Sequence, residues 1–272
     1  MVTSLRPKAG PTHDYRFPQF RDEVLPNGIR LITAPVAKLP LVTVSVLIDA
    51  GSTNDPMGKE GTAALTAAGM LEGTSDYDGA KLAEEFEQLG TSFETGADWD
   101  STYLKITVLS SRLREAAKLL GDAISQPVFP EREIERLKAE RLAEILQLET
   151  EPRGLADEKF SEFLYADNSR YSKPDEGNAE SVGSLTRADV EEFYRSNYKS
   201  KATTVIVAGD ISSDDARAVI TDAFRAWPSG AAREQRLVAA ARTDTKRVHI
   251  VNKPDAPQSE LRVGHVGLPR RH

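Results

Sequence analysis

The side chains that could perform chemistry in this sequence are few and far apart. It contains four histidines and no cysteine, and the histidines are His13, His249, His265 and His272. Protein zinc sites are built from histidine, cysteine and carboxylate ligands, and two histidines on one helix reach the same ion when they lie about four residues apart. No two of these histidines have that spacing. The lack of cysteine also excludes disulfides, thiolate nucleophiles and iron–sulfur clusters.

Composition narrows the class of protein. Of 272 residues, 39% are hydrophobic and 28% are charged, which is typical of a globular chain. The net charge is -7 and there is no run of Lys and Arg, so we expect no nucleic-acid partner. The sequence contains no run of about 18 apolar residues, so we expect no membrane span. The polar N-terminus predicts a soluble, cytoplasmic chain as given, and a periplasmic location stays open if a signal segment was removed.

Strands and helices alternate along the chain. Asn27-Gly28 between apolar runs predicts a hairpin over residues 23–32. Further strands are expected at 41–48, 91–97, 101–109, 202–208, 248–251 and 260–266. Helices are expected at 58–71, 79–89, 110–124, 131–150, about 152–164, 186–198 and 210–227, with a loop over 167–183. This order predicts an α+β fold: a mixed, mostly antiparallel sheet with helices packed on one face.

The expected domain organisation has four parts. Residues 1–19 are predicted to form an extended arm, and residues 20–230 the main domain. Residues 231–247 read as a polar, alanine-rich linker, and residues 248–272 as the start of a second domain that the sequence does not complete. Trp99, between Asp98 and Asp100, is expected to anchor its turn in the core, with a surface contact role as the alternative.

Several short stretches together resemble a known family. They are 25–31, 46–52, 89–92, 185–190, 208–210 and 252–259, and their order over about residues 20–268 is similar to that of the inverted-zincin peptidases of family M16. That family includes pitrilysin, insulin-degrading enzyme and mitochondrial processing peptidase. The resemblance implies the LuxS/MPP-like metallohydrolase fold, with this chain carrying the N-terminal domain of a two-domain half.

The same resemblance locates the family's metal motif. Active relatives carry His-x-x-Glu-His on a helix that precedes Gly-Thr, and a further Glu on a downstream helix. Anchored on Gly73-Thr74, the motif falls on Ala64, Ala67 and Ala68, and the downstream ligand falls near Glu144. A methyl group neither binds zinc nor accepts a proton. The resemblance therefore implies a chain with no catalytic residues, no metal and no cofactor.

The implied function is that of a non-catalytic subunit or domain, of the bacterial M16B type. It would pair with an active zinc peptidase subunit or fused domain, form a chamber wall and help to bind a peptide substrate. The candidate peptide-docking strand consists of Thr91, Ser92, Phe93, Glu94 and Thr95. An ordinary edge or paired strand is the alternative there. Glu144 is expected to be an ordinary helix residue, paired with Lys138, Arg141 or a neighbouring helix. Two other functions stay open: a stand-alone scaffold or binding module, and an active zinc peptidase with non-standard ligands.

Overall fold

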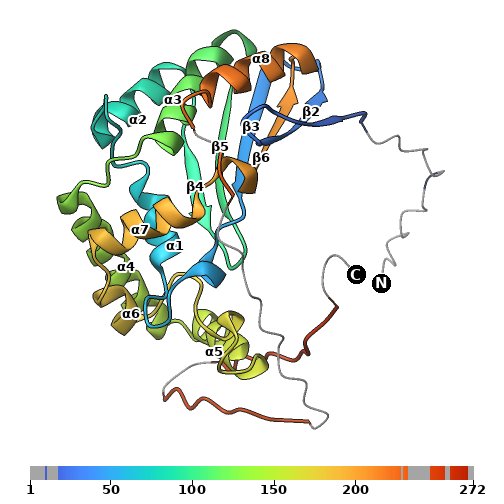
Figure 1. Cartoon of the computed structure of the whole chain (residues 1–272). Coiled ribbons are helices and arrows are strands. Elements are labelled where there is room, and N and C mark those ends of the chain that lie inside the picture. Colours follow the sequence, from blue (N-terminus) through green and yellow to red (C-terminus); the bar gives the residue numbers. More distant parts are fainter. Residues whose placement is uncertain (1–9, 11–17, 228, 232–245, 255–257, 269–272) are drawn as a thin grey trace, which may run out of the picture.

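A six-stranded sheet organises the chain in the computed structural model, which describes residues 10, 18–227, 229–231, 246–254 and 258–268 (Figure 1). Most of the expected arm (1–19) and linker (231–247) therefore lies outside the described residues. The strands in order across the sheet are β1 (Arg21–Val24), β2 (Arg30–Pro35), β6 (Thr203–Gly209), β3 (Leu41–Ile48), β5 (Thr102–Leu109) and β4 (Glu94–Ala97). Only β2 and β6 pair in parallel; the other neighbours are antiparallel. The expected α+β fold with a mixed, mostly antiparallel sheet is confirmed.

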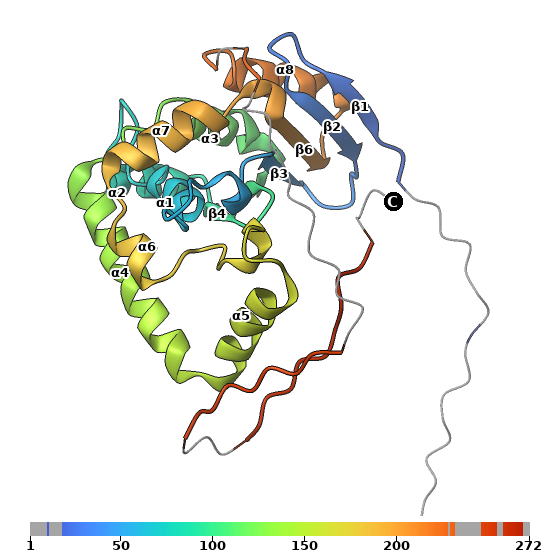
Figure 2. The same cartoon turned by 60° about the horizontal axis from the view of Figure 1, so that its bottom comes forward.

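The two faces of the sheet differ in burial because side chains alternate along each strand. In β3, Val42, Val44, Val46 and Ile48 are fully buried, whereas the residues between them are partly exposed. Helices α3 (Leu113–Ser125) and α8 (Ser213–Ala223) lie over the buried face (Figures 1 and 2). The alternation of apolar residues in β3 thus identifies the face of the sheet that packs against the core.

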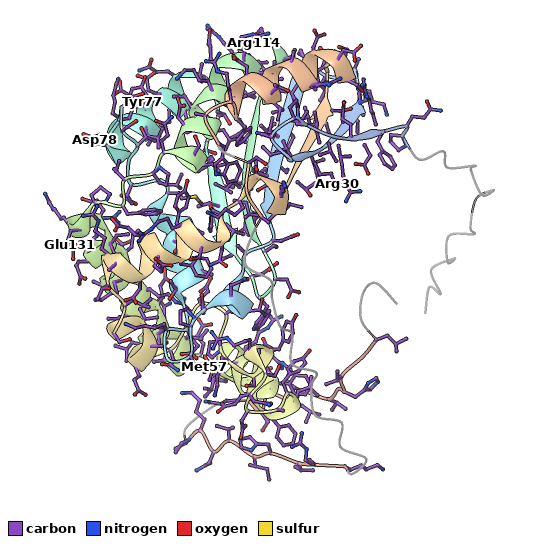
Figure 3. All side chains as sticks on the ribbon, viewed as in Figure 1. Arg30, Met57, Tyr77, Asp78, Arg114 and Glu131 are labelled. Atoms are coloured by element: carbon purple, nitrogen blue, oxygen red, sulfur yellow. The ribbon has the colours of Figure 1, made fainter. Side chains whose placement is uncertain are left out.

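The remaining helices are α1 (Thr62–Gly69), α2 (Gly79–Gln88), α4 (Glu131–Thr150), α5 (Pro152–Leu164), α6 (Ala179–Gly183) and α7 (Arg187–Asn197). Of these helices, α2 packs beside α3 and α1 packs against β4 and β5 (Figure 1). Figure 3 shows Asp78 at the start of α2, where its carboxylate accepts a hydrogen bond from the backbone N–H of Lys81. Thr186 and Asp189 form a capping box at the start of α7. Helix α1 packs against both α4 and α7, so its position is set by the main domain.

Two expectations about secondary structure are wrong. The segments 248–251 and 260–266 have apolar alternation, but neither is a strand in the structure. Within the described residues neither segment pairs with a strand, and Val248, Ile250 and Val263 are more than 80% exposed. Instead the segment runs past α5, where Arg247 stacks on Phe163 and Arg262 pairs with Asp157. The expected loop over 167–183 contains a short 3-10 turn at Arg170–Ser172 and helix α6.

None of the helices in the described residues is both long and apolar enough to cross a lipid bilayer.

Close contact between α3 and α8 depends on a glycine. A Cβ atom added at Gly121 would lie 2.2 Å from the backbone oxygen of Ala223, which cannot move without shifting α8. We expect Gly121→Ala to lower the free energy of unfolding by about 1–3 kcal/mol, the usual cost of overpacking. The matched control is Gly183→Ala, since no atom lies within 4 Å of the added Cβ there. Urea denaturation of both variants checks this, and equal stability of the two would contradict the close packing of the helices.

Candidate functional site

The positions that resemble the metal motif lie together on helix α1. Ala64 and Ala68, four residues apart, are the half-buried residues of the helix, so they lie on the side that is partly open to solvent. Ala67 is fully buried. The backbone therefore has the arrangement that could present two side chains to one ion, but the side chains present are methyl groups.

Glu144 is not directed at a metal site. It lies on α4 with 63% of its side chain exposed, and its carboxylate is 3.1 Å from Nη1 of Arg141. Among the described residues no group of three or more His, Cys, Asp or Glu side chains lies close enough together to hold a metal ion. His249 stacks beside Phe163 and the ring of His265 contacts a backbone oxygen, and both lie in the C-terminal segment. These residues do not provide the set of ligands that a catalytic zinc requires.

The candidate docking strand is shorter than expected and lies at the edge of the sheet. Residues 91–93 are not part of a strand, and β4 begins at Glu94. Thr91 is buried, Ser92 and Glu94 are exposed, and Phe93 and Thr95 are partly buried. Phe93 stacks on Phe86 of α2, with ring centroids 5.2 Å apart. Thus the N-terminal part of the predicted docking segment packs against α2. Within this segment, the strand that a peptide could pair with is β4.

Three loops interlock at the end of the sheet that carries α1. The backbone N–H groups of Ser52 and Thr53 donate to the carbonyls of Asp98 and Trp99 in the β4–β5 turn. The indole N–H of Trp99 donates to the Lys173 carbonyl at 3.2 Å. The Tyr171 hydroxyl donates to Asp100 at 2.6 Å. Trp99 is partly buried and ties its turn to the third loop, so it anchors the structure at a loop junction rather than in the core.

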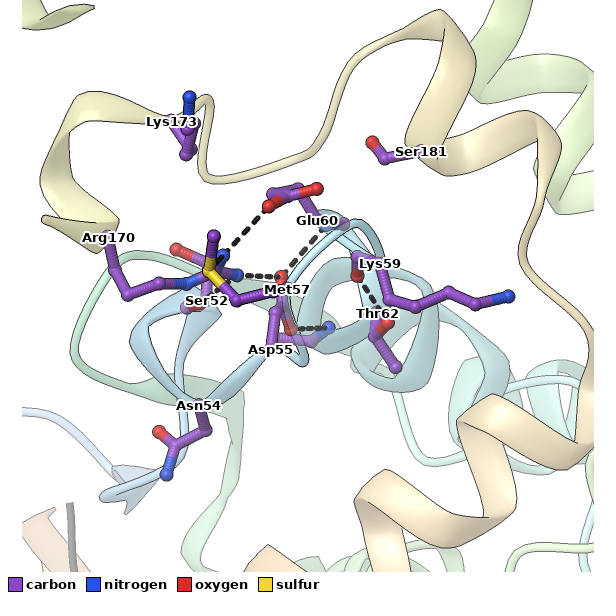
Figure 4. A network of polar contacts seen from close by, with 12 residues as sticks. Ser52, Asn54, Asp55, Met57, Lys59, Glu60, Thr62, Arg170, Lys173 and Ser181 are labelled. Atoms are coloured by element: carbon purple, nitrogen blue, oxygen red, sulfur yellow. Dashed lines mark hydrogen bonds and ion pairs between the residues drawn. The ribbon is translucent and has the colours of Figure 1, made fainter. Parts of the chain in front are cut away.

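Two carboxylates and one guanidinium, those of Asp55, Glu60 and Arg170, lie together at the start of α1 (Figure 4). Asp55 accepts hydrogen bonds from the backbone N–H groups of Gly61 and Ala63, both at 2.8 Å. Arg170 donates to Glu60 at 2.8 Å and to the Ser52 carbonyl at 3.3 Å, and its Nη2 lies 3.9 Å from the Asp55 carboxylate. The cluster holds the first turn of α1 and joins it to the 3-10 turn at Arg170.

Burial changes the acidity of both carboxyl groups. Burial raises the pKa of Asp55 to about 7, although its backbone N–H donors and the nearby Arg170 act in the opposite direction. Burial also acts to raise the pKa of Glu60, but its backbone hydrogen bonds and the guanidinium of Arg170 outweigh it and lower that pKa. Glu60 is therefore the charged partner of Arg170 at neutral pH.

This cluster was not predicted from the sequence. Asp55 and Glu60 precede the alanine-rich helix, which is a signal for an N-terminal cap. Arg170 lies 110 residues beyond Glu60, and no local pattern links them. The cluster stabilises the start of α1, the helix that carries the three alanines. It therefore positions the candidate site and supplies no reactive group to it.

Comparison with known proteins places these segments in a family. Residues 32–173 match the model of the insulinase family (peptidase family M16), and residues 184–272 match that of the peptidase M16 inactive domain. A probable mitochondrial-processing peptidase subunit beta from Arabidopsis thaliana is 27% identical over 234 residues, which are 85% of this chain and 43% of that protein. Human cytochrome b-c1 complex subunit 1 is 26% identical over 197 residues, 71% of this chain and 40% of that protein.

A solved structure agrees with these sequence matches. The peptidase M16 inactive domain from Pseudomonas fluorescens superposes with a TM-score of 0.77 at 27% identity, covering 82% of this chain and 54% of that one. The chain thus spans about half the length of these three proteins, from 40% to 54%.

Proposed function

Because the chain belongs to the M16 (insulinase) peptidase family, we propose that it is a non-catalytic member that pairs with a zinc-carrying relative. Its role would be to form a wall of the substrate chamber and to help bind an extended peptide. The observation that carries the proposal is the set of three methyl groups at Ala64, Ala67 and Ala68 on helix α1. Neither a metal ligand nor a general base is available there.

Two further features support a binding role. Helix α1, which the resemblance matches to the metal-motif helix, is held by Asp55 and by packing on α4 and α7. The edge strand β4 packs beside α1, and an edge strand offers unpaired backbone groups to an extended peptide.

Zinc content is the first test. The chain is purified with zinc present, and zinc per chain is measured by elemental analysis with and without a chelator. We expect near-zero zinc and no cleavage of an unstructured protein substrate. The double variant Ala64→His and Ala68→His is the comparison variant: it places two imidazoles four residues apart on the half-open side of α1 and should bind more zinc than the wild type. About one zinc per wild-type chain, lost with the chelator, would overturn the proposal and favour an active peptidase with non-standard ligands.

A scaffold role is the second candidate. The similarity to cytochrome b-c1 complex subunit 1 favours it, because that protein is named as a subunit of a larger complex. Co-purification with a relative that carries an intact His-x-x-Glu-His motif, followed by peptide binding, separates the two roles. A zinc-free chain that forms a stable complex and binds no peptide would be a scaffold.

A further inference from the structure

The edge of the sheet at β4 combines a glycine with an aromatic ring. In the register of β4 and β5, Gly96 lies opposite Tyr103 and Glu94 lies opposite Lys105. These four residues lie on the face of the sheet away from the core, since the alternate β5 residues Leu104 and Thr102 are fully buried.

The ring of Tyr103 occupies the space that a side chain at position 96 would fill. A Cβ atom added at Gly96 would lie 2.6 Å from the Tyr103 hydroxyl oxygen and 2.8 Å from Cζ. The phenol therefore lies across the backbone of β4 and extends toward the free edge. Tyr103 remains 42% exposed, so part of the ring is open to a partner.

Charge at this edge is unevenly distributed. Lys105 pairs with Glu94 at 3.2 Å, and these two charges offset each other. The strand continues into the exposed Asp98 and Asp100. Asp98 accepts hydrogen bonds from the backbone of Asp100 and Ser101, which holds its carboxylate at the turn. The end of the edge near the turn is therefore negative and complements a cation.

We propose that Gly96 and Tyr103 form a subsite for a large apolar side chain of an extended peptide that pairs with the free edge of β4, with a lysine or arginine two residues away at Asp98. This inference rests on the peptide-binding role proposed above and specifies two side chains of the peptide that would bind to β4. A side chain opposite Gly96 meets no neighbour on β4 and lies against the Tyr103 ring, where apolar surface leaves water. The residue two positions along projects from the same face of the added strand and reaches the acidic turn.

Binding of matched peptides tests the subsite. Fluorescent nine-residue peptides with Thr and Val flanks carry Phe or Ser at the centre, and Lys or Glu two residues away. Fluorescence anisotropy is measured with the full chain. We expect the Phe–Lys peptide to bind about tenfold more tightly than the Ser–Lys peptide, the effect of partly burying one aromatic side chain.

Variants test whether the Tyr103 ring, and not the surrounding surface, causes the preference for Phe. Tyr103→Ala should bring the Phe and Ser peptides to equal affinity, whereas Tyr103→Phe should keep the preference. Leu109→Ala is the matched control: it removes an exposed apolar side chain from the same face of β5, beyond the part that pairs with β4. It should keep the full preference. Asp98→Asn, which retains a hydrogen-bond acceptor for the turn, should reduce the Lys-over-Glu preference about threefold and weaken its salt dependence.

The outcomes are distinct from those of the zinc test. Equal binding of the Phe and Ser peptides to the wild type, an unchanged preference in Tyr103→Ala, or no binding of any peptide would overturn the subsite. A tightly bound zinc would overturn the non-catalytic role and leave the peptide preference as measured. Thermal unfolding of each variant shows that the compared proteins are folded.

Discussion

Replacing Arg170 with methionine is expected to lower the free energy of unfolding by about 3–5 kcal/mol at neutral pH. The guanidinium is the cation that faces both Glu60 and Asp55, and the side chains of these three residues are 15%, 8% and 0% exposed. Methionine keeps much of the side-chain volume but leaves the Glu60 carboxylate buried without a cation. It also removes the hydrogen bond to the Ser52 carbonyl, which links the loop before α1 to the turn at Arg170. Urea denaturation at pH 7 measures the change.

Two further variants show whether the lost charge pair is the cause. In the Arg170→Met background, Glu60→Gln removes the unpaired charge and keeps an acceptor for the Gly58 N–H, so it should recover roughly half of the loss. Arg195→Met is the matched control, because Arg195 and its partner Glu192 are 68% and 66% exposed. Surface pairs contribute little, and that variant should change stability by less than about 1 kcal/mol. A loss in Arg170→Met no larger than in Arg195→Met would mean that the buried pair does not hold the start of α1.

The sequence predicted the elements whose patterns are local. The alternation of Leu41–Ile48 gave β3 at its observed bounds, and Asn27-Gly28 gave the hairpin between β1 and β2, where Gly28 has φ 97°. The same alternation at 248–251 predicted a strand that does not form, because a strand also needs a partner. Alternation specifies which side chains share a face and leaves the neighbour undetermined.

At the candidate site, too, the sequence indicated local features but not the contacts between distant residues. The three alanines lie within five residues on one helix, and the resemblance, anchored at Gly73-Thr74, assigns the motif positions to them. The contacts that hold the helix join residues far apart in the chain, as Arg170 to Glu60 and Trp99 to Lys173 do. Likewise, the Tyr103 ring over Gly96 depends on the register of β4 and β5, which the sequence did not fix. What the sequence could not supply was the pairing of distant segments.

Ionisation of Asp55 is expected to lower the stability of the protein as the pH rises from about 4 to 7. Its pKa is raised from 3.8 to about 7 in the folded chain, because burial disfavours the charged carboxylate. Between these two values the folded state holds a proton that the unfolded state has lost. Stability therefore falls with rising pH across this range, by roughly 4 kcal/mol in total, and this group adds no further change above pH 7.

Asp55→Asn isolates this contribution from those of other titrating groups. Asparagine is neutral at every pH, and its single oxygen can serve only one of the two N–H donors, Gly61 or Ala63, so the variant loses one hydrogen bond at the start of α1. Because asparagine does not titrate, the pH dependence of the comparison comes from Asp55 of the wild type. The difference in unfolding free energy, wild type minus Asp55→Asn, should therefore be largest near pH 4 and fall steadily to a plateau above pH 7. Urea denaturation of both proteins at one-unit steps from pH 4 to 8 measures it. A difference that instead grows with pH would mean that the helix N-terminus and Arg170 outweigh burial and that Asp55 is a charged cap of α1.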